Sequence, residues 1–259
     1  MDDIAKATVA AVRMKIPDLH TAKLGPEYSY HSLPLCVIDA VFSIGVRYRN
    51  VQNVVEAWCV AQTPKWPKYS TTAKARHTIT DLIQATKGDA GVDLAHRLFG
   101  GNRQRTSSRS GILKADAVVQ FAKALQKNGV DDFSDIRNAD RAERAKQAVR
   151  SIPGQGSGLS FDYLLMLAGD DSYVKPDRMI CRFVAEAAGL PEISSHAARG
   201  AVVAACRNLA GEFPNLTPRL LDHLIWSYQR AQHSPGHGTR STVDDAGPEP
   251  CKRPRPARL

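Results

Sequence analysis

The sequence predicts an all-α fold. Apolar residues recur at helical spacing along most of the chain, and glycine and proline separate these stretches. No segment alternates apolar and polar residues as a half-buried strand does. Helices are therefore expected at residues 3–14, 32–45, 50–62, 71–86, 92–99, 111–127, 135–149, 159–168, 178–188, 194–212 and 217–232.

Composition indicates a folded protein of one domain or of two lobes. The chain has 259 residues, of which 43% are hydrophobic and 24% are charged, as in ordinary globular proteins. No apolar run approaches the roughly 20 residues that span a bilayer, and Asp2 and Asp3 do not fit the start of a signal peptide. We expect a cytoplasmic protein without a membrane partner.

Local signals justify the first three helices. Asp2 or Asp3 can cap the first helix. The second has Ser32 as its cap and Pro34 in its first turn, is apolar on almost every side, and ends at Gly45, so it belongs in a core. The third is amphipathic, with an apolar face made of Val51, Val54, Val55, Trp58 and Cys59.

A polar loop follows the helix that ends near residue 99. It carries Arg103, Arg105 and Arg109 and no acidic residue. The simpler interpretation is a solvated loop, and the alternative is a loop that contacts the phosphates of DNA.

The stretch Ser151–Arg182 organises the rest of the chain. Its glycines, Gly154, Gly156 and Gly158, lie between two predicted helices, where a tight turn presents backbone N–H groups at a helix N-terminus. Such a turn suits a phosphate, although glycine clusters also mark ordinary turns. A dinucleotide-binding fold is disfavoured, because the segment before the glycines is charged and helical.

The Ile-Pro-Gly-x-Gly sequence at Ile152, followed by Asp177 in a Val-x-Pro-Asp setting, resembles the helix-hairpin-helix (HhH-GPD) DNA glycosylase superfamily, in particular its endonuclease III-like members. The resemblance implies a two-lobed helical fold with the active site in the cleft between the lobes. The implied lobes are 33–170, with the hairpin at 152–158, and 1–32 plus 171–233. Residues 234–259 are rich in Pro, Gly, Ser, Thr and charged residues, and this composition predicts a disordered basic tail.

The resemblance gives Asp177 a catalytic role. The matching aspartate stabilises the cationic sugar that forms as the glycosidic bond breaks, and it activates the nucleophile. The alternative is that Asp177 only caps the helix that follows it.

Bifunctional members of the superfamily carry a hairpin lysine where this chain has Gly158, so the resemblance implies a monofunctional enzyme that uses water. The five cysteines are widely spaced, which excludes the clustered iron-sulfur loop of many relatives. No cofactor is expected, and the hairpin carbonyls are a candidate site for a monovalent cation.

The remaining candidate residues are of two kinds. The expected DNA contacts are Gly154, Gln155, Gly156, Ser157, Gly158, Lys114, Arg103, Arg105, Arg109 and Lys175. The residues expected to line the base pocket or to enter the opened duplex are Ser43, Arg47 and Tyr48, with Trp66 and Tyr69 as weaker candidates. Gly45 replaces a glutamine that is frequent in the superfamily.

The formal net charge of +9 favours a polyanionic partner. We therefore expect a monomer that binds double-stranded DNA and excises a damaged or modified base, as in base excision repair. The alternative is a helix-hairpin-helix DNA-binding module that has lost the chemistry. A helical protein that never binds DNA is disfavoured by the charge and the glycine turn.

Overall fold

The computed structural model describes residues 2–69 and 77–232. Over these residues the chain is helical and contains no β-strand, which confirms the all-α prediction. The segment 70–76, at the start of the helix expected at 71–86, and the expected tail at 234–259 lie outside the described residues. The elements are α1 Asp3–Lys15, η1 Pro26–Tyr28, α2 Leu33–Phe42, α3 Tyr48–Ala61, α4 Ile79–Ala85, α5 Gly91–Leu98, α6 Lys114–Lys127, α7 Phe133–Ile136, α8 Ala139–Arg150, α9 Leu159–Leu167, α10 Arg178–Ala188, α11 Ser195–Leu209 and α12 Pro218–Gln232.

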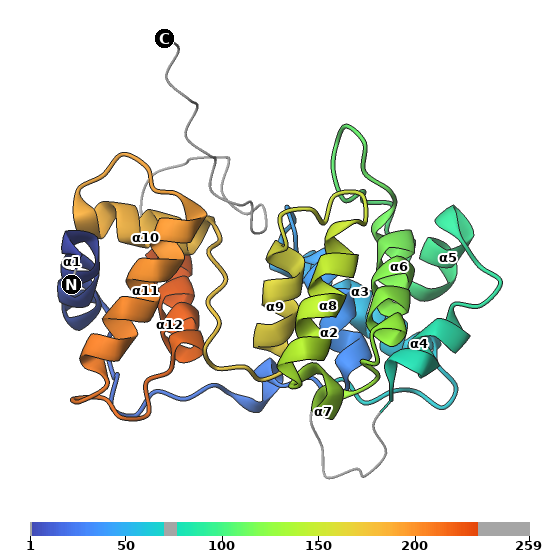
Figure 1. The fold of residues 1–259 in the computed structure, drawn as a ribbon, viewed down its shortest axis with the longest axis horizontal. Coiled ribbons are helices and arrows are strands. Elements are labelled where there is room, and N and C mark those ends of the chain that lie inside the picture. Colours follow the sequence, from blue (N-terminus) through green and yellow to red (C-terminus); the bar gives the residue numbers. More distant parts are fainter. Residues whose placement is uncertain (1, 70–76, 233–259) are drawn as a thin grey trace. The chain divides into compact units, whose positions relative to one another are not determined.

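The chain divides into two compact units (Figure 1). The central unit is Gly25–Gly169, and the terminal unit combines Met1–Leu24 with Asp170–Leu259, of which the structure describes 2–24 and 170–232. Helix α1 therefore joins the last three helices. None of the helices within the described residues is long and apolar enough to cross a bilayer.

The central unit is built around α2. All ten of its residues are buried, and it packs against α3, α6 and α9, which confirms the prediction of a core helix. Near its C-terminus the ring of Phe42 lies 5.3 Å from that of Phe99, which in turn lies 5.3 Å from Trp58 of α3. Burial of such side chains contributes about 2 kcal/mol each, so α2 fixes the elements around it.

The terminal unit has its own core. Helix α1 packs against α10 and α11, and α12 closes the group (Figure 1). The strongly amphipathic α10 buries Phe183 and Val184 against Val12 of α1 and Val202 of α11. The terminal unit is therefore a small four-helix arrangement that draws on both ends of the described chain.

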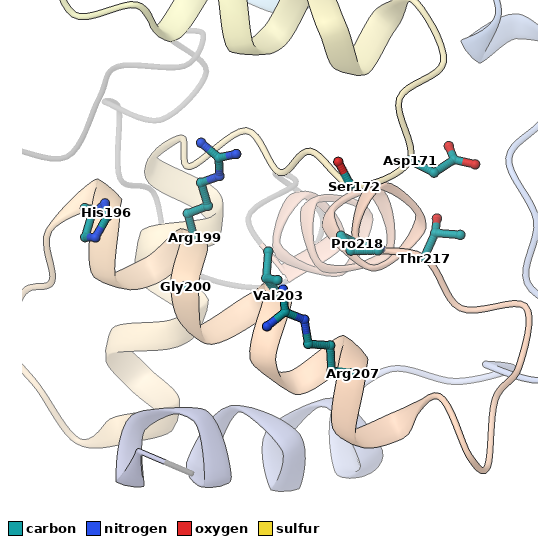
Figure 2. A pocket seen from close by; sticks show the side chains of 9 residues that line it. All are labelled: Asp171, Ser172, His196, Arg199, Gly200, Val203, Arg207, Thr217 and Pro218. Atoms are coloured by element: carbon teal, nitrogen blue, oxygen red, sulfur yellow. The ribbon is translucent and has the colours of Figure 1, made fainter. Parts of the chain in front are cut away.

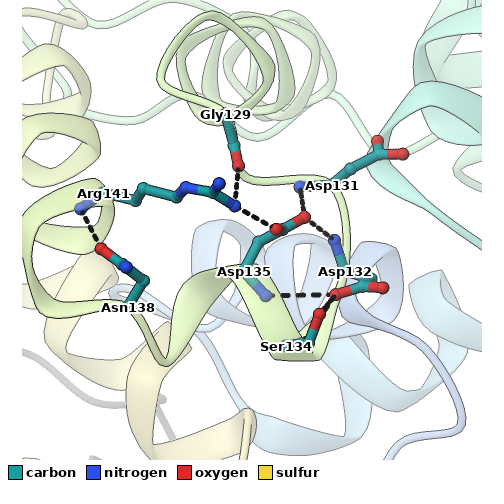
Figure 3. Close-up of polar contacts among 7 residues, drawn as sticks. All are labelled: Gly129, Asp131, Asp132, Ser134, Asp135, Asn138 and Arg141. Carbon is teal, nitrogen blue, oxygen red and sulfur yellow. Dashed lines mark hydrogen bonds and ion pairs between the residues drawn. The ribbon is translucent and has the colours of Figure 1, made fainter.

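The segment expected as one helix at 135–149 forms two helices instead. Asp132 caps the short α7 and Asn138 caps α8 through its contact with the amide of Arg141. The Asp135 carboxylate accepts hydrogen bonds from the amides of Asp131 (3.0 Å) and Asp132 (3.3 Å) and pairs with Arg141 (Figure 3). Two consecutive caps divide the helix because each offers the backbone an alternative to helical hydrogen bonds.

Asp135→Ala is expected to lower the free energy of unfolding by about 2 kcal/mol, because it removes the acceptor of two backbone amides and an arginine. Arg141 also donates to the carbonyl of Gly129 (3.1 Å) and would lose its second anchor. Urea denaturation at neutral pH measures the change. Asp140→Ala, an exposed position in the first turn of α8, is the control, and equal effects of the two substitutions would contradict the prediction.

Candidate functional site

The turn between α8 and α9, residues 151–158, has the geometry of a tight hairpin. The amide of Gln155 donates to the carbonyl of Ile152 (2.9 Å), and the amide of Gly158 donates to the carbonyl of Gln155 (3.0 Å). Gly154 (φ 84°) and Gly158 (φ 75°) occupy the left-handed region, where glycine has no steric cost. Gly158 is also the N-cap of α9, so the hairpin leads directly into a helix N-terminus.

The hairpin divides into an anchored part and an exposed part. The Gln155 side chain is buried and accepts a hydrogen bond from the Ser160 hydroxyl, so it is an anchor and not the expected DNA contact. Gly154, Gly156 and Ser157 are exposed. Within the described part of the chain, no hydrogen bond is recorded from their three amides. These amides are available to an anion.

Several hairpin carbonyls already have donors. Arg150 donates from Nε to the carbonyl of Gly156 (3.1 Å), and Thr106 donates from Oγ1 to that of Pro153 (2.8 Å). The carbonyls of Ile152 and Gln155 accept the turn hydrogen bonds. A monovalent cation at this turn would have to share these oxygens.

Thr106 joins the arginine-containing segment to the hairpin. This segment, residues 101–113, is named here the arginine loop. A Cβ on Gly154 would lie 2.5 Å from both Cβ and Oγ1 of Thr106, so the Thr106 side chain packs against the hairpin backbone at a place where only glycine fits. The loop is closed by an antiparallel bridge between Arg105 and Leu113 and by a hydrogen bond from the Lys114 amide to the Gln104 carbonyl (2.8 Å).

The three arginines of the arginine loop are exposed. Arg105 donates from Nε to the carbonyl of Gly111 (2.9 Å), and Nη2 of Arg103 lies 3.1 Å from Nε2 of His96. Together with the exposed Arg150 of α8, they place positive charge on the loop and the helix that donate to the hairpin carbonyls. Sequence reasoning found these arginines, but it missed Thr106 because nothing in the pattern marks it.

Lys114 differs from its expected role. Its side chain is only 2% exposed, and its ammonium donates to the carbonyls of Phe42 (3.0 Å) and Ile44 (2.6 Å) at the end of α2. An ammonium at a helix C-terminus satisfies carbonyls that the helix leaves unpaired. Lys114 is therefore a buried structural link between α6 and α2, and not a phosphate contact at the DNA edge.

The three residues expected to enter the duplex differ in their exposure to solvent. Ser43 is 1% exposed, and its hydroxyl donates to the Ala40 carbonyl of α2 (3.4 Å). The expected contact between Ser43 and DNA is therefore wrong, because the side chain is buried. Arg47 is exposed. Tyr48 is half-buried, and burial, followed by the nearby Asp39 carboxylate, raises the pKa of its hydroxyl.

Asp39 is a fully buried carboxylate of α2 that sequence reasoning did not select. It accepts a hydrogen bond from the Tyr30 hydroxyl (2.7 Å). The ring of Tyr69 lies 6.1 Å from that of Tyr30. Trp66 is buried and stacks on His77 at 3.9 Å, which assigns it to the core.

Asp177 lies in the terminal unit as the N-cap of α10. Its Oδ1 accepts hydrogen bonds from the amides of Met179 (2.8 Å) and Ile180 (3.1 Å), and the residue is 5% exposed. Burial raises the pKa of this carboxyl, while Lys175 and the two amides oppose the shift. Both hydrogen bonds recorded for its carboxylate within the described residues use Oδ1, which leaves Oδ2 for another partner.

Asp222 is a second buried carboxylate beside Asp177. It lies on α12, is 5% exposed, and accepts a hydrogen bond at Oδ1 from the Lys175 amide (3.0 Å). Burial first, and then the charge of Asp177, raise its pKa well above the ordinary value. The sequence offered one signal, a carboxylate directly after two leucines on the apolar face of the helix.

Lys175 is also buried, with 8% of its surface exposed, so it is not the exposed phosphate contact that was expected. It opposes the rise in the pKa of both carboxyl groups. Two buried carboxylates and one buried ammonium therefore form an ionisable cluster, and such clusters are frequent at functional sites.

A family model described as "Domain of unknown function (DUF8548)" matches residues 6–230. The chain belongs to this family. The DUF8548 match spans the hairpin, the arginine loop, Asp177 and Asp222. The comparisons with curated proteins and with solved structures gave no match.

Proposed function

We propose that this DUF8548 protein is a monofunctional DNA glycosylase of the helix-hairpin-helix type, which acts as a monomer on double-stranded DNA without a cofactor. The observation that carries the proposal is the hairpin itself. Its exposed Gly154, Gly156 and Ser157 amides lie on the same turn as the carbonyls that Arg150 and the arginine loop contact.

Amides at a helix N-terminus bind a phosphate through hydrogen bonds and the helix dipole. Nearby guanidinium groups add a salt-dependent attraction that needs no particular base sequence. The hairpin and the arginine loop would therefore hold the DNA backbone, while selection of the base would fall to other residues. The exposed Arg47 and the half-buried Tyr48 remain candidates from the set expected to enter the duplex.

The chemistry of the proposal centres on Asp177. An ionised carboxylate stabilises the positive charge that develops on the sugar as the bond from C1′ to the base nitrogen breaks. The same group accepts a proton from the water whose oxygen bonds to C1′. Oδ1 is held by two amides, so Oδ2 is the oxygen for these roles. Gly158 offers no amine, so no Schiff base forms at the hairpin.

A non-catalytic DNA-binding module is the second candidate. It is favoured by the N-cap geometry, because the two hydrogen bonds recorded for the Asp177 side chain are those of a capping residue. The two candidates share the phosphate-binding hairpin and differ only in the role of Asp177.

The deciding experiment is a screen of the purified full chain against duplexes that each carry a different damaged or modified base. Hot alkali then reveals abasic sites. Excision of one or more bases supports the glycosylase, whereas binding without any excision favours the module. Absence of duplex binding at low salt would contradict both.

Gly156→Asp is expected to weaken duplex binding and to reduce its salt dependence, because it adds a negative charge where a phosphate should lie. A Cβ at this position meets only the Arg150 carbonyl at 3.7 Å, so the side chain fits without strain. Gly156→Ala is the matched control, since it adds the Cβ without the charge. Fluorescence anisotropy at several salt concentrations measures both variants, and equal binding by the two would argue against a phosphate at this turn.

Borohydride is expected to trap no covalent complex between the protein and a processed duplex, because Gly158 replaces the amine of bifunctional enzymes. The product strand should stay intact until alkali is added. Denaturing gels report both outcomes, and efficient trapping would assign the reaction to an amine elsewhere in the chain.

A further inference from the structure

The terminal unit contains an open pocket of about 700 Å³ (Figure 2). It is formed by α11, the start of α12 and the segment that precedes Tyr173. Its lining residues are Asp171, Ser172, His196, Arg199, Gly200, Val203, Arg207, Thr217 and Pro218. None of these residues was selected from the sequence.

One wall of the pocket is a basic face of α11. Arg199, Val203 and Arg207 follow at intervals of four, so they line the same side of the helix. His196 precedes them by one turn. The guanidinium of Arg199 lies 5.0 Å from the centre of the Tyr173 ring, a contact that holds a guanidinium in place.

Gly200 lies on this wall between the two arginines and has no side chain. A Cβ built on Gly200 has no other atom within 4 Å, and the residue has ordinary helical geometry. A glycine inside a helix costs about 1 kcal/mol relative to alanine. At Gly200 this cost is not offset by closer packing of a neighbouring element, and the absence of a side chain leaves space in the pocket.

The opposite wall is polar and carries negative charge. In Figure 2, Asp171 and Thr217 lie across the pocket from His196 and Arg199. Oδ1 of Asp171 lies 3.5 Å from the Arg219 guanidinium, and Thr217 Oγ1 accepts a hydrogen bond from the Leu220 amide (3.2 Å). The pocket therefore has a cationic side, a side that accepts hydrogen bonds, and apolar surface from Val203 and Pro218.

We propose that this pocket binds a nucleotide, with its phosphate on Arg199 and Arg207. Guanidinium groups match the geometry of phosphate oxygens. The volume lies in the range of pockets for small organic molecules and exceeds the needs of a phosphate ion. Asp171 repels the phosphate, and its carboxylate accepts hydrogen bonds from the amino groups that nucleobases carry. The nucleotide comes from solution or from a single strand.

This inference stands apart from the proposed glycosylase function, because it rests on different residues and needs no duplex. Titration calorimetry of the full chain compares three probes: inorganic phosphate, a deoxynucleoside monophosphate, and a short single-stranded oligonucleotide. The monophosphate is expected to bind more tightly than phosphate alone. An oligonucleotide that binds more tightly still would identify the source as a strand, and equal or weaker binding would identify a free nucleotide.

Two variants test the location. Arg207→Gln should weaken monophosphate binding about tenfold, the effect of one charge-assisted hydrogen bond. Gly200→Leu should weaken it by a similar or larger factor, because the leucine side chain extends into space that Gly200 leaves empty. The matched controls are Gly200→Ala, which adds only a Cβ, and Lys23→Gln, which removes an exposed charge elsewhere in the unit.

Both controls should bind as the wild type does, and circular dichroism should show every variant folded. The proposal is overturned if the wild type binds none of the probes, if the monophosphate binds no better than phosphate, or if Gly200→Leu and Gly200→Ala bind alike. If Gly200→Leu does not fold, Arg207→Gln is the deciding variant: weaker binding of the monophosphate supports the pocket, and unchanged binding overturns the proposal.

Discussion

Asp177→Asn is expected to lower the rate of base excision by about a hundredfold or more on a duplex that the wild type processes. The substitution removes the charge that would stabilise the sugar cation and the base that would activate water. Asparagine retains an oxygen that can accept from the Met179 and Ile180 amides, so the cap of α10 should persist. Duplex affinity should hold or rise slightly, because one negative charge is lost.

Single-turnover excision and anisotropy measured on the same duplex separate these effects. Asp162→Asn is a control, since Asp162 is a carboxylate of α9 whose ion pair with Lys146 (2.7 Å) lies beside the hairpin helix. A wild-type rate for Asp177→Asn would refute the catalytic assignment and leave the binding module as the better proposal.

Asp222→Asn is expected to raise the free energy of unfolding near neutral pH, because burial and the charge of Asp177 disfavour an ionised carboxylate at this position. The folded protein holds the Asp222 proton more tightly than the unfolded chain does, because its pKa is raised by burial and by Asp177. The stability that this proton contributes is complete below the ordinary aspartate pKa and is lost as the pH rises through the folded pKa. Asparagine stays neutral throughout.

The increase in the free energy of unfolding caused by Asp222→Asn should therefore be small near pH 4 and should grow as the pH approaches neutrality. Urea denaturation at several pH values measures it, with Asp171→Asn as the control because the Asp171 side chain is 55% exposed. A loss of stability at neutral pH would mean that Lys175 and Arg219 more than compensate the buried charge.

The helical pattern predicted the fold class because apolar spacing and capping residues act locally. The core position of α2 and the N-cap at Asp177 both follow from such signals. The split between α7 and α8 was missed, although Asp132 and Asn138 are capping residue types, because charged helical spacing continues across both caps. Arg141 also links α8 to Asp135 of α7 and to the Gly129 carbonyl, and the local pattern does not predict these contacts.

The residues around the site were harder to predict because burial is a property of packing. Lys114 and Lys175 have the residue type of a phosphate contact, and both are buried. Asp222 has the type of a solvated helix residue, yet it lies beside Asp177 through the hydrogen bond to the Lys175 amide. Contacts between residues some fifty positions apart leave no mark in the local pattern. The tight turn that presents the hairpin amides was predictable, because a cluster of glycines indicates backbone with positive φ angles, as at Gly154 and Gly158.

The close approach of Thr106 to Gly154 has a consequence for the thermodynamics of binding. A free loop that becomes ordered on a ligand loses about 0.5–1.5 kcal/mol for each immobilised side chain. The arginine loop is already closed by its bridge and fixed to the hairpin in the absence of a ligand. Its backbone entropy is lost during folding, so association with a polyanion should show little of the heat-capacity change that accompanies coupled folding.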